Sequence, residues 1–289
     1  MTAKRKQPAD EGRYKCNLLI LGDTHIGSDG GLCPPQGFRR DSGVRMPQNR
    51  GQEFSWAAWE EAKAWVRQVI KDEPFDALLG GDLVDGMHHN STTEMSDNIN
   101  DQESADVEIL APMIKGADRV FGIRGTEAHV GHAGQSDERI CRALGCVPDD
   151  DGRYARYDLW YRLGRKDGPL VHNLHHIGTV GTQAYESTAL VKEYAESCIE
   201  ASRMGLKPPD VIVRHHRHRG MDVKIPTVRG QALVFTVQGW QLKDSAFTWR
   251  AAGVRQSVPQ LGLTVLQFSE EAGPWTRHFT RFGKRSREV

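Results

Sequence analysis

Short apolar runs and helix-like segments alternate through the first half of the chain, and this alternation constrains the fold more than any other feature. Each run has the length of a buried strand, and each ends at or beside a glycine. Strands are predicted over 14–21, 75–82 and 119–125. Helices are predicted over 53–71, 98–114 and 136–144. Such an alternation favours an α/β fold with a mainly parallel sheet.

The second half of the chain contains more strands than helices. Segments at 154–163 and 169–174 flank a Gly-Arg-Lys-Asp-Gly turn, which predicts a hairpin. A helix is predicted over 182–204 and a buried strand over 211–213. Further strands are predicted over 231–237, 261–268 and 275–281. The later part of the fold is therefore expected to be mainly β.

Composition narrows the class of protein. The 38 Lys and Arg residues balance 38 Asp and Glu residues, so no overall charge attracts nucleic acid. No apolar run approaches the roughly 18 residues of a membrane span, and none follows the basic start as in a secretory signal. A cytoplasmic protein of a bacterial or phage-infected cell is expected. Residues 14–283 are predicted to form a single domain between a flexible N-terminal tail, 1–13, and a basic C-terminal tail, 284–289.

Aspartate and histidine residues recur where the predicted strands end. Taken singly, such an Asp is more often a helix cap or turn former than a ligand, and a lone His is usually structural. Recurrence at five strand ends favours one shared site instead, because ligands of open α/β sheets bind beyond the carboxyl ends of the strands. The residues are Asp23 and His25; Asp82 and Asp85; Glu127 and His129; His175 and His176; and His215, His216 and His218.

These residue types indicate a metal centre. Carboxylates and imidazoles suit Mn, Zn, Fe or Ni, and the 5 cysteines form no CxxC pair that would indicate a thiolate zinc site. The Asp and His residues outnumber the ligands of a single ion, so two divalent ions that share a bridging carboxylate are expected. Manganese is the metal expected first, with Zn, Fe or Ni as alternatives. Two such ions suit phosphoryl transfer, because they stabilise the attacking and the leaving oxygen.

The order and spacing of the motifs resemble those of the calcineurin-like metallophosphoesterases over about residues 15–220. The resemblance is carried by Gly22-Asp23-Thr24-His25, Gly81-Asp82-Leu83-Val84-Asp85-Gly86 and His216-Arg217-His218. It implies a four-layer α/β/β/α sandwich with mixed sheets and a dinuclear centre. On this resemblance, the first metal is held by Asp23, His25 and His218. Asp82 bridges the ions, and His175 and His216 hold the second metal.

The chain departs from the family pattern at two motifs. The family has Gly-Asn-His before an acidic residue, whereas this chain has Gly125-Thr126-Glu127-Ala128-His129. Glu127 or Thr126 is expected to complete the ligand set of the second metal, and Glu127 is assigned as that ligand. His129 is expected to act as an acid or to stabilise the phosphate. His215 replaces the usual glycine of the last motif and is expected to contact substrate. Two assignments stay open. His175, which comes first after its strand, is preferred to His176 as the metal ligand. Asp85 is expected to brace the Asp82 turn rather than to bind metal.

Arginine side chains are the expected phosphate contacts. The long loop 28–52 leaves the first strand at the edge of the site, so Arg39, Arg40 and Arg45 are candidates to bind substrate, with a solvated basic loop as the alternative. Arg124 is expected to stabilise the developing charge together with His129.

The expected function is hydrolysis of a phosphate ester by in-line attack of a metal-bound hydroxide. A nuclease, that is, a DNA phosphodiesterase of the same fold, is the first alternative, because Gly-Asp-Leu-Val-Asp resembles the nuclease branch of the family. A degenerate binding scaffold is the second. The expected partner is a phosphate-ester substrate, with nucleic acid and nucleotides left open, and no membrane. The chain also resembles members from bacteriophage and prophage genomes, and it predicts no oligomeric state.

Overall fold

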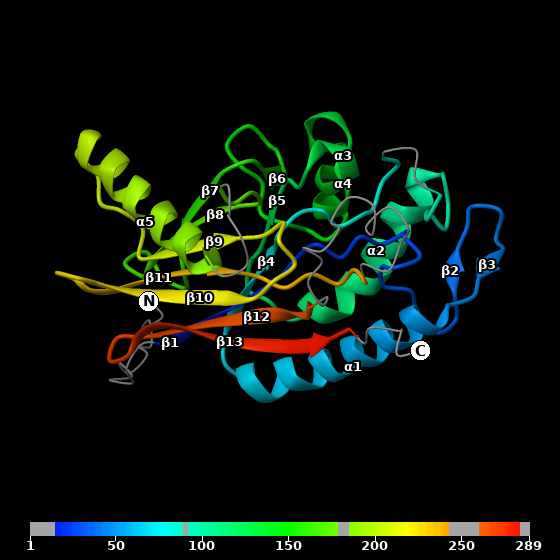
Figure 1. Cartoon of the computed structure of the whole chain (residues 1–289), viewed down its shortest axis with the longest axis horizontal. Helices are drawn as coiled ribbons and strands as arrows, with labels where there is room; N and C mark the ends of the chain where they lie inside the picture. Colours follow the sequence, from blue (N-terminus) through cyan, green and yellow to red (C-terminus); the bar gives the residue numbers. More distant parts are fainter. Residues whose placement is uncertain (1–14, 89–91, 179–184, 243–259, 284–289) are drawn as a thin grey trace, which may run out of the picture.

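Two mixed β-sheets form the centre of the protein (Figure 1). The structure, a computed structural model, describes residues 15–88, 92–178, 185–242 and 260–283. The first sheet has the order β13-β12-β1-β4-β5-β6, in which β1, β4, β5 and β6 run parallel and β12 runs antiparallel to both of its neighbours, β1 and β13. Its strands are β1 (Lys15–Leu21), β4 (Phe75–Leu79), β5 (Val120–Ile123), β6 (Ala155–Arg156), β12 (Gln260–Ser269) and β13 (Gly273–Phe282).

The second sheet has the order β10-β11-β9-β8-β7, and β11, β9 and β8 are parallel neighbours. Its strands are β7 (Leu159–Arg162), β8 (Leu170–Leu174), β9 (Val211–Arg214), β10 (Met221–Thr227) and β11 (Gly230–Thr236). A two-stranded ribbon pairs β2 (Phe38–Arg39) with β3 (Arg45–Met46). The helices are α1 (Arg50–Ile70), α2 (Ile99–Ile114), α3 (Glu127–Val130), α4 (Gln135–Ala143) and α5 (Glu186–Arg203), with a 3₁₀ turn η1 (His132–Gly134).

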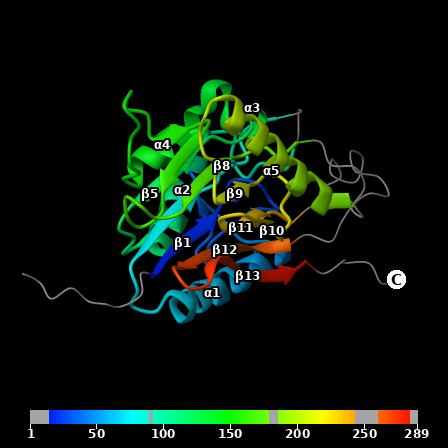
Figure 2. The same cartoon turned by 90° about the vertical axis from the view of Figure 1, so that its left-hand side faces the viewer.

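Three clusters of buried apolar side chains hold these elements together. In the first, α1, α2 and α4 pack on the face of the six-stranded sheet that carries Leu19 and Leu21. The opposite face, with Leu18 and Ile20, packs on the five-stranded sheet, because successive side chains of a strand point to opposite faces. The third cluster joins α5 to the other face of the five-stranded sheet. Figure 2 shows α1 and α5 on opposite sides of the stacked sheets, and the predicted α/β class with mixed sheets is confirmed.

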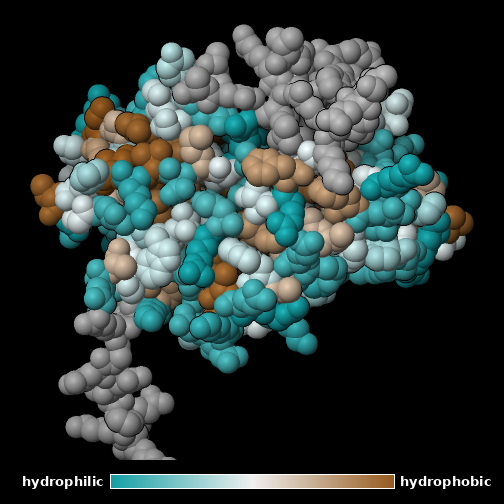
Figure 3. All heavy atoms as spheres, turned by 60° about the horizontal axis from the view of Figure 1, so that its bottom comes forward, coloured by the Kyte–Doolittle hydropathy of each residue, from teal (hydrophilic) through white to brown (hydrophobic). Residues whose placement is uncertain are grey.

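Helix α1 illustrates how local sequence produces these layers. The Asn49 side chain accepts a hydrogen bond from the Gln52 N–H at 2.9 Å, and the Gln52 side chain accepts one from the Asn49 N–H at 3.1 Å, which forms a capping box. The buried stripe of α1 includes Trp59, whose ring meets that of Trp240 edge to face at 4.8 Å. Figure 3, in which the underside of Figure 1 comes forward, shows a mainly hydrophilic surface with hydrophobic side chains gathered towards one end. None of the described helices is both long and apolar enough to cross a membrane.

The structure corrects several predicted elements. The hairpin of β7 and β8 is confirmed, but 154–163 divides between two sheets, because β6 pairs with β5 and β7 pairs with β8. Strand β10 was not predicted, although Met221, Val223 and Ile225 alternate with charged and polar residues. The ribbon β2–β3 lies within the expected loop. The tails predicted at 1–13 and 284–289 lie outside the described residues, as does the start of the helix predicted over 182–204, and the single-domain division stays a prediction.

Candidate metal centre

The candidate ligands lie on loops that follow four parallel strands of the two sheets. β1 and β4 end at one edge of the first sheet, and their loops are joined by hydrogen bonds from the Asp23 N–H to the Gly81 carbonyl, 2.9 Å, and from the His25 N–H to the Asp82 carbonyl, 3.2 Å. The loops after β8 and β9 are joined in the same way, because the His215 N–H donates to the His175 carbonyl at 2.9 Å. Loops distant in sequence therefore converge at one edge of the sandwich.

One group of potential ligands is made by Asp23, His25 and His218, all of them buried. The two Nε2 atoms of His25 and His218 are 3.1 Å apart, and His218 Nε2 lies 3.3 Å from Asp23 Oδ1. Such separations match neighbouring ligands of one ion, since zinc–ligand distances are about 2.0–2.2 Å. This is the set that the sequence assigned to the first metal.

A second group is made by Asp82, His175 and His216, the set assigned to the second metal. His175 Nε2 lies 3.0 Å from Asp82 Oδ2 and 3.9 Å from Asp23 Oδ1, so its ring connects the two groups. The other nitrogen, Nδ1, donates to the Gly80 carbonyl at 2.8 Å, which directs Nε2 into the site. His216 Nδ1 lies 4.0 Å from Asp82 Oδ2, and its side chain is 47% exposed.

Backbone strain is concentrated in these loops. Seven described residues other than glycine have a positive φ, and five of them are candidate ligands. Such a conformation costs on the order of 1–3 kcal/mol and persists only where the surroundings enforce it, commonly at functional sites. The five are Asp23 (φ 49°), His25 (φ 44°), Asp82 (φ 49°), His216 (φ 71°) and His218 (φ 54°).

The electrostatics of the site favour a bound cation. Burial raises the pKa of Asp82, but the hydrogen bond and charge of His175 outweigh burial and hold this pKa well below its usual value. Burial lowers the pKa of His175, whereas Asp82 and Asp23 raise it, to about 10 overall. A proton is therefore strongly attracted to the position that a divalent ion would take, and binding of that ion would displace it.

The donor set passes a simple test of fit for a metal. Asp23 Oδ1 is fully buried and accepts no hydrogen bond, although the Nε2 atoms of His218 and His175 lie 3.3 and 3.9 Å from it, and a buried carboxylate oxygen without a hydrogen bond is costly. The Oδ2 atom of the same carboxylate accepts from the His216 N–H at 3.2 Å, which turns Oδ1 towards the site. A cation at the first group would compensate that oxygen, so the residues present fit a divalent metal ion.

The third motif differs from the prediction, because Thr126 rather than Glu127 faces the centre. The Thr126 N–H donates to Asp82 Oδ1 at 2.6 Å, and its hydroxyl lies 3.0 and 3.2 Å from the two oxygens of Asp82. Thr126 precedes α3 and Glu127 is its first residue, so the helix turns the glutamate outward. The Glu127 carboxylate is 69% exposed and lies 3.9 Å from His132, and the structure does not bring it to either group.

His129 lies beside the first group. Its Nδ1 is 2.7 Å from the Asp85 carbonyl, which can only accept, so Nδ1 carries the proton and Nε2 the lone pair. The ring meets that of His25 edge to face at 4.4 Å. Burial and the charge of His25 lower the pKa of His129 to about 4, so the ring is neutral near pH 7. The acid or phosphate-stabilising role of His129 stays a prediction.

Two other predicted site residues have structural roles. His215 is fully buried, its pKa lowered to about 3 by burial, and its Nε2 lies 3.2 Å from Asn173 Oδ1. A Cβ at Gly80 would lie 2.1 Å from this ring, so His215 packs against the residue whose carbonyl orients His175, and it belongs to neither ligand group. Arg124 donates to the carbonyls of Ala155 (2.8 Å) and Ala133 (2.6 Å). These bonds engage Nε and Nη1, and Nη2 lies 3.8 Å from the Glu138 carboxylate, so the expected role of Arg124 towards a phosphate stays a prediction.

The arginines of the long loop are also used within the fold. Arg40 donates through Nε and Nη2 to the Met95 carbonyl, at 3.0 and 2.5 Å, and Arg45 donates to the Gly37 carbonyl at 2.9 Å. Arg39 and Arg40 line a hollow of 320 Å³ together with Asp101 and Glu108, which compete with any phosphate. A substrate contact by Arg39 stays a prediction.

Asp85 has two neighbours, His88 and Gln241, that the sequence did not assign to the site. Asp85 Oδ1 lies 3.2 Å from His25 Nδ1 and accepts from Gln241 Nε2 at 3.1 Å, while Oδ2 lies 3.3 Å from His88 Nε2. Asp85 therefore orients His25, and the expectation that it also braces the Asp82 turn stays a prediction. His176 is exposed and belongs to neither ligand group, which agrees with the preference for His175.

Comparisons with known proteins return only distant structural likenesses. No family model matches the chain, and no curated protein matches it. The fold is similar to a predicted phosphoesterase from Streptococcus pneumoniae (10% identity, 93% of this chain, 99% of that chain, TM-score 0.35). It is also similar to a metallophosphoesterase from Sphaerobacter thermophilus (9% identity, 93% and 89% covered, TM-score 0.36).

A third likeness is to the sulfate thiohydrolase SoxB from Thermus thermophilus, with 11% identity, 92% of this chain and 56% of that chain covered, and a TM-score of 0.38. Scores this low assign no function to this chain. The resemblance to calcineurin-like metallophosphoesterases is carried instead by the ordered motifs and by the convergence of their side chains on one site. The expected bacteriophage or prophage origin stays a prediction.

Proposed function

We propose that the protein is a metal-dependent phosphoesterase that holds two divalent ions and hydrolyses a phosphate ester. The observation that carries the proposal is the pair of ligand groups joined by His175, whose Nε2 lies 3.0 Å from Asp82 and 3.9 Å from Asp23. On this proposal, Asp82 would be the ligand that the two ions share. When bound, two such ions stabilise the charge on the attacking and leaving oxygens and make a water acidic near neutral pH.

The residues of the chain would orient this chemistry. Thr126 donates to both oxygens of Asp82 and so fixes the plane of the bridging carboxylate. The Gly80 carbonyl and Asp85 hold His175 and His25 through their Nδ1 atoms. Each group supplies three protein ligands, which leaves positions for water and a phosphate oxygen.

The substrate would enter beside the second group. His216 is the one ligand of the six that is exposed, so the solvent side of the centre lies there. Manganese is the metal proposed first, because oxygen and imidazole ligands without thiolate suit it, and Zn, Fe or Ni would fit the same donors. Phosphomonoesters, phosphodiesters and DNA all remain candidate substrates, and the degenerate scaffold is the outcome expected if no metal binds.

The test is metal analysis together with a substrate panel. Wild-type protein dialysed after loading with Mn should retain about two ions per chain. It should then hydrolyse a chromogenic phosphomonoester, a chromogenic diester, or one of single-stranded DNA, duplex DNA and a cyclic nucleotide. Asp82→Asn should lower the rate by on the order of 100-fold or more, because the lost charge weakens both sites.

Glu127→Gln is the matched control for Asp82→Asn. It makes the same acid-to-amide change in the third motif, but the Glu127 side chain is 69% exposed and should be dispensable. A wild-type protein that holds no metal would contradict the proposed function, and activity that survives Asp82→Asn would contradict the bridging role.

A further inference from the structure

Asp137, in the first turn of α4, connects the two loops that meet at Asp82. Its side chain is fully buried. Oδ2 accepts a hydrogen bond from the Gly125 N–H at 2.7 Å, and Oδ1 accepts one from the Leu83 N–H at 3.3 Å. Leu83 directly follows Asp82, and Gly125 directly precedes Thr126. One carboxylate therefore holds both loops next to the residues that face the candidate centre.

Besides Asp137, the two loops are joined by the hydrogen bonds from Thr126 to the Asp82 carboxylate, and they approach each other closely. A Cβ at Gly81 would lie 2.5 Å from the Gly125 nitrogen, and a Cβ at Gly125 would lie 2.1 Å from Asp82 Oδ1. At Gly81 and Gly125 the close approach leaves no room for a side chain, so the backbone of one loop lies directly against the other loop. Gly81 and Asp82 also have positive φ values of 82° and 49°, and a strained turn of this kind persists only when its surroundings hold it.

Stabilisation of α4 does not explain Asp137. An acidic residue in a first turn commonly interacts with the free N–H groups of its own helix. The hydrogen bonds of Asp137 instead go to the two loops, and α4 has no side-chain cap hydrogen bond at its N-terminus. The side chain is directed away from its helix and towards the loops after β4 and β5.

We propose that Asp137 is a positioning residue for the metal centre, which holds the Asp82 turn against the Thr126 loop so that the Asp82 carboxylate faces both ligand groups. This inference rests on the proposed function. It assigns Asp137 no contact with substrate or metal. Asp137 acts on Asp82 by two routes. Through the Leu83 N–H it holds the residue that follows Asp82. Through the Gly125 N–H it holds the residue before Thr126, whose own N–H donates to Asp82 Oδ1 at 2.6 Å.

The variant that tests the role is Asp137→Asn. An amide has one accepting oxygen, so its NH₂ group must face one of the two N–H donors, and one loop is released. Manganese affinity, measured by calorimetric titration of the metal-free protein, should fall about 10–100-fold, the cost typical of lost supporting hydrogen bonds. Should Asp137→Asn fail to fold, Asp137→Ser, which keeps one acceptor in a smaller side chain, should show the same loss.

Two controls separate positioning from general stability. Asp106→Asn is the same buried acid-to-amide change on the neighbouring α2, where neither carboxylate oxygen has a hydrogen-bond partner, and it should leave manganese affinity unchanged. Ile140→Val shortens a buried side chain on α4 itself and should lower the melting temperature without weakening manganese binding.

The outcomes distinguish this inference from the proposed function. If wild-type protein binds no manganese, the proposed function fails. If wild type binds manganese and Asp137→Asn binds it equally tightly, the positioning role fails. An affinity loss in Asp137→Asn matched by Ile140→Val would also overturn it, since the effect would then follow from stability alone.

Discussion

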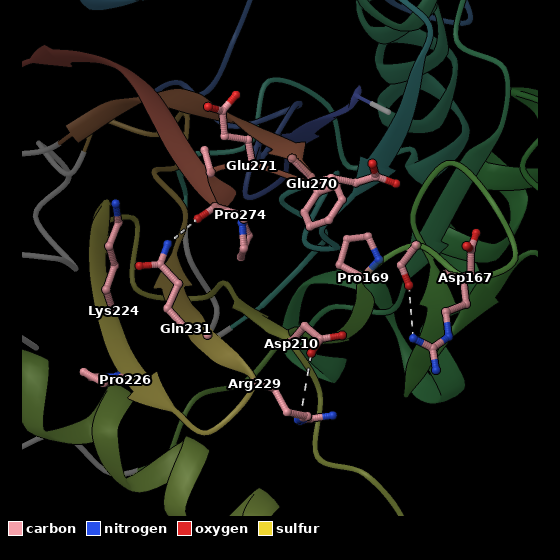
Figure 4. A pocket seen from close by; sticks show the side chains of 16 residues that line it. Asp167, Pro169, Asp210, Lys224, Pro226, Arg229, Gln231, Glu270, Glu271 and Pro274 are labelled. Carbon is pink, nitrogen blue, oxygen red and sulfur yellow. Dashed lines mark hydrogen bonds and ion pairs between the residues drawn. The ribbon is translucent and has the colours of Figure 1, made fainter. Parts of the chain in front are cut away.

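The two ends of the five-stranded sheet differ in a way that shows where function is concentrated. At the carboxyl ends of β8 and β9 lie the loops with the candidate ligands. At the opposite end, the turns β7–β8, β10–β11 and β12–β13 surround a hollow of 640 Å³ (Figure 4). This hollow is lined by charged and polar residues, including Lys224, Arg229, Asp210 and Gln231. Its volume suits a small molecule, yet its lining lacks the strained Asp and His residues and the buried carboxylate oxygen without a hydrogen bond that occur at the ligand end.

Side chains of the hollow are engaged with their own backbone. Gln231 donates to the Pro274 carbonyl at 3.0 Å, Asp210 accepts from the Leu170 N–H at 2.9 Å, and Arg229 donates to the Pro208 carbonyl at 3.1 Å. Positive φ angles in its lining belong to glycines. At the ligand end, by contrast, Asp23 Oδ1 is buried without a hydrogen bond and the ligands themselves are strained. The combination of backbone strain with a buried carboxylate oxygen that accepts no hydrogen bond, at the same residue, indicates the functional end better than volume does.

The largest expected effect comes from removing a ligand at the functional end. His218→Ala deletes an imidazole whose Nε2 lies 3.1 Å from His25 Nε2 and 3.3 Å from Asp23 Oδ1. One of the two ions should be lost on dialysis, and the hydrolysis rate should fall by about 100-fold or more. Metal content and the rate with the best substrate of the panel measure this.

His278→Ala is the matched control for His218→Ala. His278, on β13, lies near Asp222 and Thr264 and belongs to neither ligand group. It should keep both ions and most of its activity. Equal losses in the two variants would show that the ligand end is not distinct from the rest of the molecule.

The ligands were predictable because their signals are local. An apolar run that ends in Gly-Asp places its Asp at a strand end, and parallel strands bring such ends together. Directions of side chains were less predictable. Glu127 and Thr126 are adjacent, and only the start of α3 decides which of them faces Asp82. Arg124, which directly follows β5, was expected to stabilise developing charge, but the carbonyls that hold it come from Ala133 and Ala155, which no local pattern connects to it.

Asp137 and His215 show why supporting residues escape a reading of the sequence. Asp137 lies in a helix, where an acidic residue in the first turn is ordinary, and its two partners are backbone N–H groups that carry no residue-specific signal. His215 lies inside a motif rich in ligands, yet its ring fills the space over Gly80. Sequence patterns identify the ligand loops, whereas the contacts that position them depend on how the layers pack.

An intermediate effect is expected at Asp106, a buried polar group that is not a ligand. Burial raises the pKa of Asp106 well above 3.8, and Asp137 and Glu103 add to the shift. The folded protein therefore keeps this acid protonated, whereas the unfolded chain ionises it at about pH 4. The contribution of Asp106 to stability is complete below that pH and is lost as the pH rises towards its folded pKa.

Asp106→Asn removes this titration and should stabilise the protein near neutral pH. The free energy of unfolding should rise by about 1–3 kcal/mol at pH 7, and the gain should shrink towards pH 4. Denaturant unfolding of both proteins at the two pH values measures the difference. A gain that is the same at both pH values would contradict the assigned shift. No gain at pH 7 would show that Asp106 has a compensating partner in solution.

The smallest effect is expected at the hollow of the opposite end. Lys224→Ala combined with Asp167→Ala removes one charge of each sign from its lining and keeps the net charge at zero. Asp167 is 74% exposed and pairs with Arg165 at 2.7 Å, and exposed pairs contribute only about 0–1 kcal/mol. Stability should change by no more than that amount, and the hydrolysis rate by less than about twofold, within the range of ordinary surface changes. A tenfold loss of activity, with metal content unchanged, would mean that the hollow binds part of the substrate or controls the site across the sheet. In that case the volume of a hollow, as well as backbone strain and unpaired polar atoms, would indicate a functional site in this fold.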